Sequence, residues 1–189
     1  GEGVNINADE DINIDAYNES DARHLVGALA ISSGKKAVGA SISGIYLRED
    51  VQVTIGAENG GDNSTVTRLT ADGSIDVDAK ADQEAITMMA AGGVSTNDVA
   101  AAGAFGFNVL DTDVEARITE DAVLQATTGA IGVRADSNTN IRNFGLAVSG
   151  SGGGNSVGGS LVLNLFLTDK QVIVGSSTSA DNNISMNAA

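Results

Sequence analysis

A short phrase recurs along this chain at nearly constant spacing, and this recurrence constrains the fold more than any other feature. Segments that read apolar, variable, apolar, variable, Ala begin at Ile12, Ile75, Ile131 and Ile184. Successive openings lie 63, 56 and 53 residues apart. Such internal repetition predicts a stack of similar units that share one continuous core.

Two further sets of positions keep the first two spacings without a gap, and the length differences gather in a Gly- and Asn-rich connection at Asn59–Asn63. These positions are Ile42, Phe105 and Leu161, and Ile55, Ile118 and Val174. Fixed strands with variable polar loops are typical of stacked repeats. The chain is therefore expected to be a single repetitive domain, 1–189, with repeats at about 11–73, 74–129 and 130–182 and the start of a fourth at 183–189.

The local pattern predicts strands. Ile12, Ile14 and Ala16 alternate with Asn13 and Asp15, and this period of two is that of a half-buried strand. Alanine-rich stretches at 85–91 and 100–104 would suit a helix. However, the aligned stretches of the third copy contain glycines, and each glycine weakens a helix by roughly 1 kcal/mol relative to alanine.

We therefore expect an all-β fold, a parallel β-helix or β-solenoid of about three degenerate repeats of 53–63 residues, each with about four short strands. A solenoid rung commonly takes roughly 20 residues, so each repeat would hold two or three rungs. The alternative is an antiparallel β-sandwich in which residues 29–32 pair with 38–43 through the turn at Ser33–Lys36.

Composition excludes several functions. The chain has no Cys, Pro or Trp, so it can form no disulfide, thiolate metal site or Cys nucleophile. With 25 acidic and 10 basic residues the formal charge is −15, which makes nucleic acid and anionic lipid poor partners. No apolar run is long enough for a transmembrane helix, and we expect no membrane insertion. The first residues lack the basic start and apolar core of a signal peptide, as expected of an internal segment.

The repeats resemble segments of large secreted surface proteins of Gram-negative bacteria, of the filamentous-haemagglutinin, leukotoxin-like and autotransporter-passenger types. The residues that carry the resemblance are the Ile-x-Val-x-Ala phrase, a following pair of Gly/Ala/Ser-rich strands, and an apolar strand that closes at Ile55-Gly56 or Val174-Gly175. It covers nearly the whole chain. It implies a right-handed parallel β-helix, export through an outer-membrane pore, and a role in adhesion or surface assembly, with no shared catalytic residues.

Acidic side chains near two of the openings are candidate metal ligands. Asp72, Asp76 and Asp78 flank one opening, and alternate carboxylates on a strand project from the same face, where Ca²⁺ could bind oxygen ligands. The third copy has Gly132 and Arg134 at matching positions, and neither an EF-hand nor a calcium β-roll pattern is present. A solvated acidic face is the preferred interpretation, so we expect no cofactor, with Ca²⁺ as the open alternative.

Other polar residues give weaker signals. Asp111 and Asp113 lie near Glu120 and Asp121, and paired carboxylates can cleave glycosides. Few bases or aromatic sugar platforms accompany them, so we expect no enzymatic activity. The single histidine, His24, is expected at a surface turn. The glycine run 150–154 lacks the ending of a phosphate loop and is expected to be a flexible turn.

Both sides of the strand at 161–166 are partly apolar, although a solenoid strand should show one side to water. We expect the second side to be covered by the chain itself, or alternatively by another chain. The last opening would also leave an uncapped rung. The candidate interface residues are Val162, Asn164, Phe166, Ile184 and Met186.

These observations predict an extracellular structural or adhesive stalk segment of a bacterial surface protein, secreted or held at the cell surface. Its partner would be a host or bacterial surface receptor or a glycan. The alternative is a filament subunit that associates end to end through open rungs, and a carbohydrate-active enzyme is the least favoured interpretation.

Overall fold

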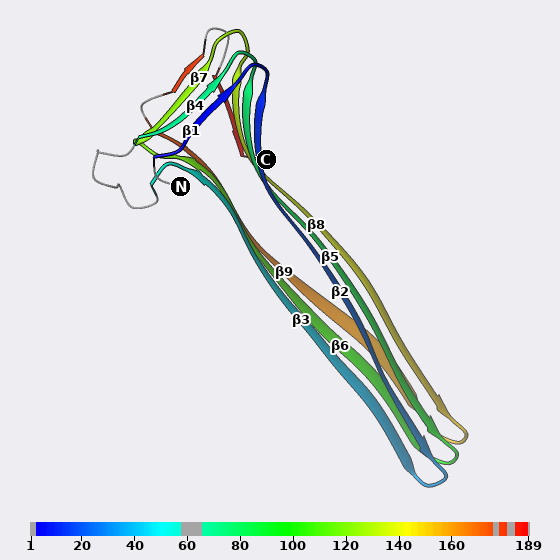
Figure 1. Cartoon of the computed structure of the whole chain (residues 1–189). Coiled ribbons are helices and arrows are strands. Elements are labelled where there is room, and N and C mark those ends of the chain that lie inside the picture. The colour runs from blue at the N-terminus through cyan, green and yellow to red at the C-terminus, as the bar shows by residue number, and fades with distance from the viewer. Residues whose placement is uncertain (1–2, 58–65, 176–177, 181–183, 189) are drawn as a thin grey trace.

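The computed structural model describes residues 3–57, 66–175, 178–180 and 184–188, and these contain strands and no helix (Figure 1). The connection at 59–63 lies outside the described residues. Four strands are short, six are 19 to 21 residues long, and one forms the last described segment. They are β1 (Asn5–Ala8), β2 (Ile12–Ser32), β3 (Lys36–Ile55), β4 (Thr67–Ala71), β5 (Ile75–Ser95), β6 (Val99–Ile118), β7 (Ala122–Ala126), β8 (Ile131–Ser151), β9 (Ser156–Val174), β10 (Thr178–Ala180) and β11 (Ile184–Ala188).

The strands form three sheets, and every ladder between the described strands is parallel. Sheet A has the order β1-β4-β7-β10, sheet B has the order β11-β8-β5-β2, and sheet C has the order β3-β6-β9. The chain visits sheets A, B and C in turn and then begins the next layer. This arrangement is solenoid-like, and the antiparallel sandwich is wrong, because the Ser33–Lys36 turn joins strands of two different sheets.

The spacings in the sequence are the spacings of paired residues. Ile12 pairs with Ile75, Ile75 with Ile131, and Ile131 with Ile184. One circuit of the chain therefore uses a whole spacing, so the expectation of two or three rungs and four short strands within each repeat is wrong. The reason is strand length: two of the three strands in each circuit have about 20 residues, where ordinary solenoid strands are short.

At one end the three sheets enclose a triangular region, which we call the head (Figure 1). Its core is aliphatic, and its inward side chains come from all three sheets because the period-two pattern places them on the enclosed side. At the end of β3, Gly56 has a φ of 100°, where a side chain would be strained. The most deeply buried side chains are Leu69, Ile75, Val77, Val114, Ile118, Leu124, Ile131 and Val133.

Beyond the head only sheets B and C continue, face to face, to the turns at the far end (Figure 1). We call this two-layer region, residues 20–49, 83–112 and 139–168, the blade. Its tip turns stack directly on each other. A Cβ on Gly154 would lie 1.9 Å from the carbonyl oxygen of Asp98, so the glycines of the third tip turn permit close backbone approach.

Alternation along β6 runs unbroken from the blade into the head. Even-numbered residues from Ala100 to Ile118 are buried, and odd-numbered residues are exposed or half-buried. The chemistry of the two sides changes while the alternation does not. In the head the outward residues include the charged Glu115 and Arg117, whereas in the blade they include the aromatic Phe105 and Phe107.

Candidate contact surface on the blade

The outer side of sheet C in the blade is apolar and open to solvent. The register Ile42–Phe105–Leu161 places these side chains in one column, and the neighbouring outward columns are also apolar. Leu163 on β9, for example, is 53% exposed. We call this surface the C-face: Val38, Ile42, Tyr46, Val99, Phe105, Phe107, Val157, Leu161, Leu163, Leu165 and Leu167.

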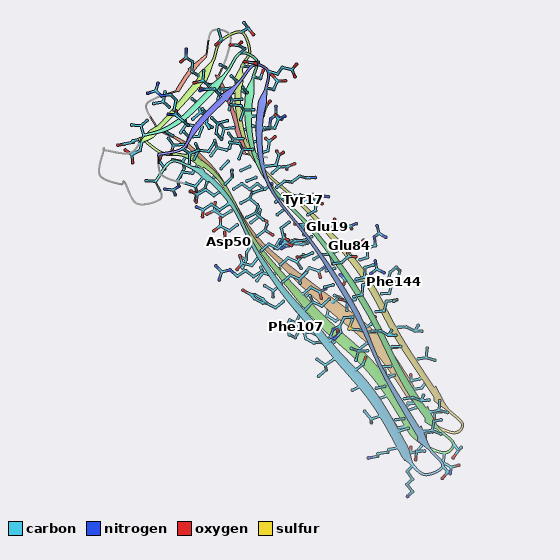
Figure 2. The ribbon with its side chains drawn as sticks, in the orientation of Figure 1. Tyr17, Glu19, Asp50, Glu84, Phe107 and Phe144 are labelled. Atoms are coloured by element: carbon cyan, nitrogen blue, oxygen red, sulfur yellow. The ribbon has the colours of Figure 1, made fainter. Side chains whose placement is uncertain are left out.

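The outer side of sheet B is apolar as well, over the half of the blade nearer the tip. Figure 2 shows Phe144 on this side and Phe107 on the side of sheet C. Phe144 is 61% exposed. This surface, the B-face, consists of Leu25, Leu29, Ile31, Met88, Val94, Phe144, Leu146 and Val148. A blade with two exposed apolar faces has the character of a contact surface, because contiguous apolar patches are uncommon on proteins without partners.

Between the two faces the interior of the blade is partly polar. Asn108, 1% exposed, accepts a hydrogen bond from the Thr87 hydroxyl at 2.9 Å. Its amide nitrogen donates to the amide oxygens of Asn143 at 2.8 Å and Asn164 at 2.9 Å. The network runs across the two sheets and down the stack. Small apolar clusters around Met89 and Leu110 lie on either side of it.

A second polar layer separates the blade interior from the head core. Glu49 is 3% exposed, and neither carboxylate oxygen has a hydrogen-bond partner. Thr112, its ladder neighbour, and Gln83 of sheet B are also buried with unpartnered side-chain atoms. Buried polar groups without partners destabilise a fold, so this layer is a weak point between two well-packed regions.

Ionic side chains gather on the outer surfaces nearer the head. The Tyr17 hydroxyl donates to Asp82 at 3.0 Å, and the Lys80 ammonium lies 2.9 Å from the same carboxylate. The hydrogen bond to Asp82 raises the pKa of Tyr17 to about 12. The hydrogen bond from Lys80, with that from Tyr17, lowers the pKa of Asp82 although partial burial opposes the shift.

Three aspartates form a column on sheet C at the junction of blade and head. Asp50 pairs with Asp113, and Asp113 with Asp169. Partial burial, and then the neighbouring charges of Asp50, Asp169 and Glu115, raise the pKa of Asp113. Like charges in register repel, so the column is an electrostatic cost that the parallel stack imposes.

The three candidate metal ligands, Asp72, Asp76 and Asp78, do not share one environment. Asp76 and Asp78 point outward from β5, whereas Asp72 lies in the turn after β4. Burial raises the pKa of Asp78, opposed by Arg134, whose guanidinium lies 4.0 Å away. Within the described ranges no group of three or more His, Asp or Glu residues is arranged to hold a metal ion. A solvated acidic face without a cofactor stays the prediction and Ca²⁺ the open alternative, to be tested by thermal melting with and without chelator.

The other polar candidates are not gathered into one site. Asp111 accepts a hydrogen bond from Tyr46 at 3.4 Å and faces outward with Asp113, whereas Glu120 and Asp121 lie in the turn beyond the end of β6. Five strand residues, about 17 Å of β6, separate Asp113 from that turn.

His24 and the glycine run also have definite places. His24 lies within β2 and shares a hydrogen bond of 2.8 Å with Ser43, so its placement at a surface turn is wrong. The run 150–154 spans the end of β8 and the third tip turn, where the Ser151 hydroxyl accepts a hydrogen bond from the Gly154 amide at 3.0 Å.

The candidate interface residues fall into two groups. Val162 packs against the cluster around Met89, and Asn164 belongs to the amide network, so both face the interior of the blade. Phe166, on the same side, is half exposed because β9 is an edge of sheet C. Ile184 and Met186 lie in β11, paired with β8. Their role at an interface stays a prediction.

Sequence reasoning assigned no role to the C-face. The unbroken alternation of β6 did indicate this surface. Counting back in steps of two from the core residues Ile118 and Val114 leads to Asn108, which must therefore point inward. Its neighbour Phe107 must then point outward. The assumption that large apolar residues point inward concealed it.

Comparison with known proteins adds no relative: no family model, no curated protein and no solved structure matches this chain. Within its described parts the chain has no helix of the length and hydropathy needed to span a membrane.

Proposed function

We propose that this chain is a structural and adhesive segment of a secreted or surface-held bacterial protein, of the kind its repeats resemble. The single observation that carries the proposal is the blade, which presents two apolar faces from a parallel stack. Each rung adds about 4.8 Å to such a stack and repeats the same outward columns, so the contact surface grows with every copy.

The charge distribution supports a role at a surface. Most of the outward charged side chains of the head are acidic, while most of the exposed large apolar side chains lie on the blade that projects from it. A projecting apolar surface on an acidic support suits contact with a receptor or a glycan-bearing partner. We propose further that the coil is right-handed, because connections between parallel strands have this hand in nearly all proteins.

The adhesive role is tested by displaying the chain on bacterial cells and measuring attachment to host cells, purified receptors and glycan arrays. We expect attachment that falls at least tenfold with Leu29→Asp on the B-face or Leu163→Asp on the C-face. The matched control is Gln52→Asp, an exposed change outside both faces. Attachment that no face variant reduces would overturn the proposal.

A filament subunit is the second candidate, and one observation favours it. The edges of sheet C are the long strands β3 and β9, which pair on one side only among the described residues. Long unpaired edges are templates for further strands. Electron microscopy of concentrated protein tests this candidate: fibres that disappear with Leu163→Pro in the β9 edge are expected, and single particles at all concentrations would exclude it.

A further inference from the structure

We propose that the C-face binds the C-face of a second copy of this chain, with the two blades antiparallel and their heads at opposite ends. This pairing is lateral, face on face, and is distinct from end-to-end growth through open strand edges. It goes beyond the proposed adhesive role and does not depend on it.

The size of the C-face is the first argument. From Val157 to Leu167 along β9, and across three strands, it is a surface of about 33 by 14 Å. Two such surfaces brought together would bury about 900 Å², just under the roughly 1,000 Å² minimum of a stable specific interface, so the dimer is expected to be weak and reversible. Twisted sheets pack face to face in sandwiches with their strands about 30° apart, so no rearrangement of the backbone is needed.

Shape is the second argument. A shallow groove crosses the C-face where small residues align in register, Ala40, Gly103 and Gly159. Four residues further along the strands, Phe107 and Leu163 form a ridge beside Gly44. A two-fold axis through the column Ile42–Phe105–Leu161 exchanges these two columns. Each copy then places its ridge in the groove of the other.

Charge selects the antiparallel orientation. Each chain carries a formal charge of −15, and its outward acidic residues gather at the head end of sheet C, around Asp50 and Asp113. Parallel blades would bring two such ends together, whereas antiparallel blades separate them. The tip turns carry Lys35 and Lys36 against the single acid Asp98. In the antiparallel pair they lie near Asp50 and Asp111 of the partner, although Lys36 also lies opposite Arg48 in this register.

The B-face as the dimer contact, and lipid as the partner of the C-face, both agree less well with the structure. The B-face covers only the half of the blade nearer the tip and is interrupted by Gly27, Ala90 and Gly92 in its outward columns. Insertion of the blade into lipid would place the unpaired backbone groups of the edge strands β3 and β9 in hydrocarbon, which is costly. A second copy covers the C-face and leaves those edges in water.

The experiment measures the mass of the chain by analytical ultracentrifugation over a range of concentrations from nanomolar to 100 micromolar. We expect a reversible monomer–dimer equilibrium. The double variant Leu163→Asp/Leu165→Asp is expected to stay monomeric throughout the range. The control is Leu29→Asp, one change of the same kind at a more exposed leucine of the B-face, and it is expected to dimerise as the unsubstituted chain does. Circular dichroism of each variant checks that the fold is kept.

The orientation of the two copies is tested by cross-linking introduced cysteines, which is possible because the chain has no native cysteine. These substitutions do not change the charge of the chain. Val38→Cys and Tyr46→Cys proteins are mixed and treated with a short bismaleimide. Antiparallel pairing predicts that heterodimers, linked from position 38 of one copy to position 46 of the other, exceed either homodimer. The reason is that the two-fold axis places position 38 opposite position 46.

Four results would overturn the proposal: a monomer at 100 micromolar, dimers that persist in the Leu163→Asp/Leu165→Asp variant, dimers that Leu29→Asp abolishes, or cross-linked homodimers in excess. A monomeric chain that instead floats with phosphatidylcholine vesicles, and loses this with Leu163→Asp/Leu165→Asp, would assign the C-face to lipid. If the unsubstituted chain dimerises but attaches to no cell, receptor or glycan, only the adhesive role is refuted.

Discussion

The head and the blade are built by the same strands with opposite chemistry. In the head, Val114 and Ile118 point inward and Glu115 points outward. In the blade, the same strand β6 turns Asn108 inward and Phe107 outward. The alternation does not slip between the two regions, so backbone register is fixed by the continuous ladder and side-chain chemistry follows it.

The difference teaches where stability and where contact reside. Aliphatic burial on three sides stabilises the head, since each buried aliphatic side chain contributes about 1.5–3 kcal/mol. The blade has only two layers, a thin interior of small residues and amides, and its largest side chains in solvent. Hydrogen-bonded ladders, and not a large core, hold it in shape. We therefore expect the head to set the stability of the molecule and the blade to set its contacts.

The largest effect is expected in the head core. Leu124→Ala should lower the free energy of unfolding by about 3 kcal/mol, because a fully buried leucine leaves a cavity. Urea unfolding at nanomolar protein, where copies do not pair, measures it. The control on the C-face, Leu161→Ala, should cost no more than about 0.5 kcal/mol. Equal losses for the two leucines would erase the distinction between the regions.

The amide network of the blade should give a smaller loss. Asn108→Ala removes the hydrogen bonds that this amide makes with Thr87, Asn143 and Asn164, while Asn143 still donates to Asn164, and the expected loss is about 2 kcal/mol. A double-mutant cycle with Thr87→Val separates the shared hydrogen bond from the rest. Independent, additive effects of the two substitutions would show that the network does not couple the sheets.

The buried layer between the regions predicts a gain. Glu49→Gln replaces a buried carboxyl group whose oxygens have no hydrogen-bond partner and should raise the free energy of unfolding by about 1 kcal/mol at neutral pH. Glu10→Gln, an exposed change of the same kind, is the control and should have no effect. If Glu49→Gln instead destabilises the chain, the carboxylate is stabilised where it lies and the layer is no weak point.

The smallest effects are electrostatic and have opposite signs. The raised pKa of Asp113 means that the folded chain holds this proton more tightly, so stability falls as pH rises above the ordinary aspartate value of about 3.9. Asp113→Asn should therefore stabilise at pH 7. The lowered pKa of Asp82 contributes stability above that value, lost as pH falls through the lowered pKa, so Asp82→Asn should destabilise at pH 7.

Both shifts in unfolding free energy should be about 0.5 kcal/mol, since the groups are near the surface. Urea unfolding at pH 7 and at pH 3 checks them. The pH 3 difference between Asp113→Asn and the unsubstituted chain should nearly vanish. Shifts of the same sign for the two variants at pH 7 would contradict the assignment of their causes.

Much of the architecture could be predicted because, in a parallel stack, the spacing between repeats in the sequence equals the spacing between paired residues. The spacing between Ile12 and Ile75 became a ladder pair, and the period-two pattern indicated strands where alanine content alone favoured a helix at 85–91. The length of each circuit could not be read in this way. Alternation is the same in one strand of 20 residues and in several short ones, so the pattern does not show where four short strands would end.

The contact surface was missed for a physical reason. Burial of large apolar side chains is the rule from which sequence reasoning starts, and the blade departs from it. Met88 and Met89 show the point clearly: adjacent strand residues face opposite ways, so only Met89 is buried although both side chains are large and apolar. The same logic applied to Phe107 would have placed it outward.

The most direct test of the account is a cysteine scan along β6, from Phe105 to Ile118, with a thiol reagent at nanomolar protein. Substitution at odd positions should label rapidly along the whole strand, and at even positions slowly, with no change of phase between blade and head. Slow labelling at positions 105 and 107 with rapid labelling at 106 and 108 would show that the strand slips by one residue in the blade and buries its aromatic side chains. The claim that the head buries its apolar side chains while the blade exposes its own would then be false.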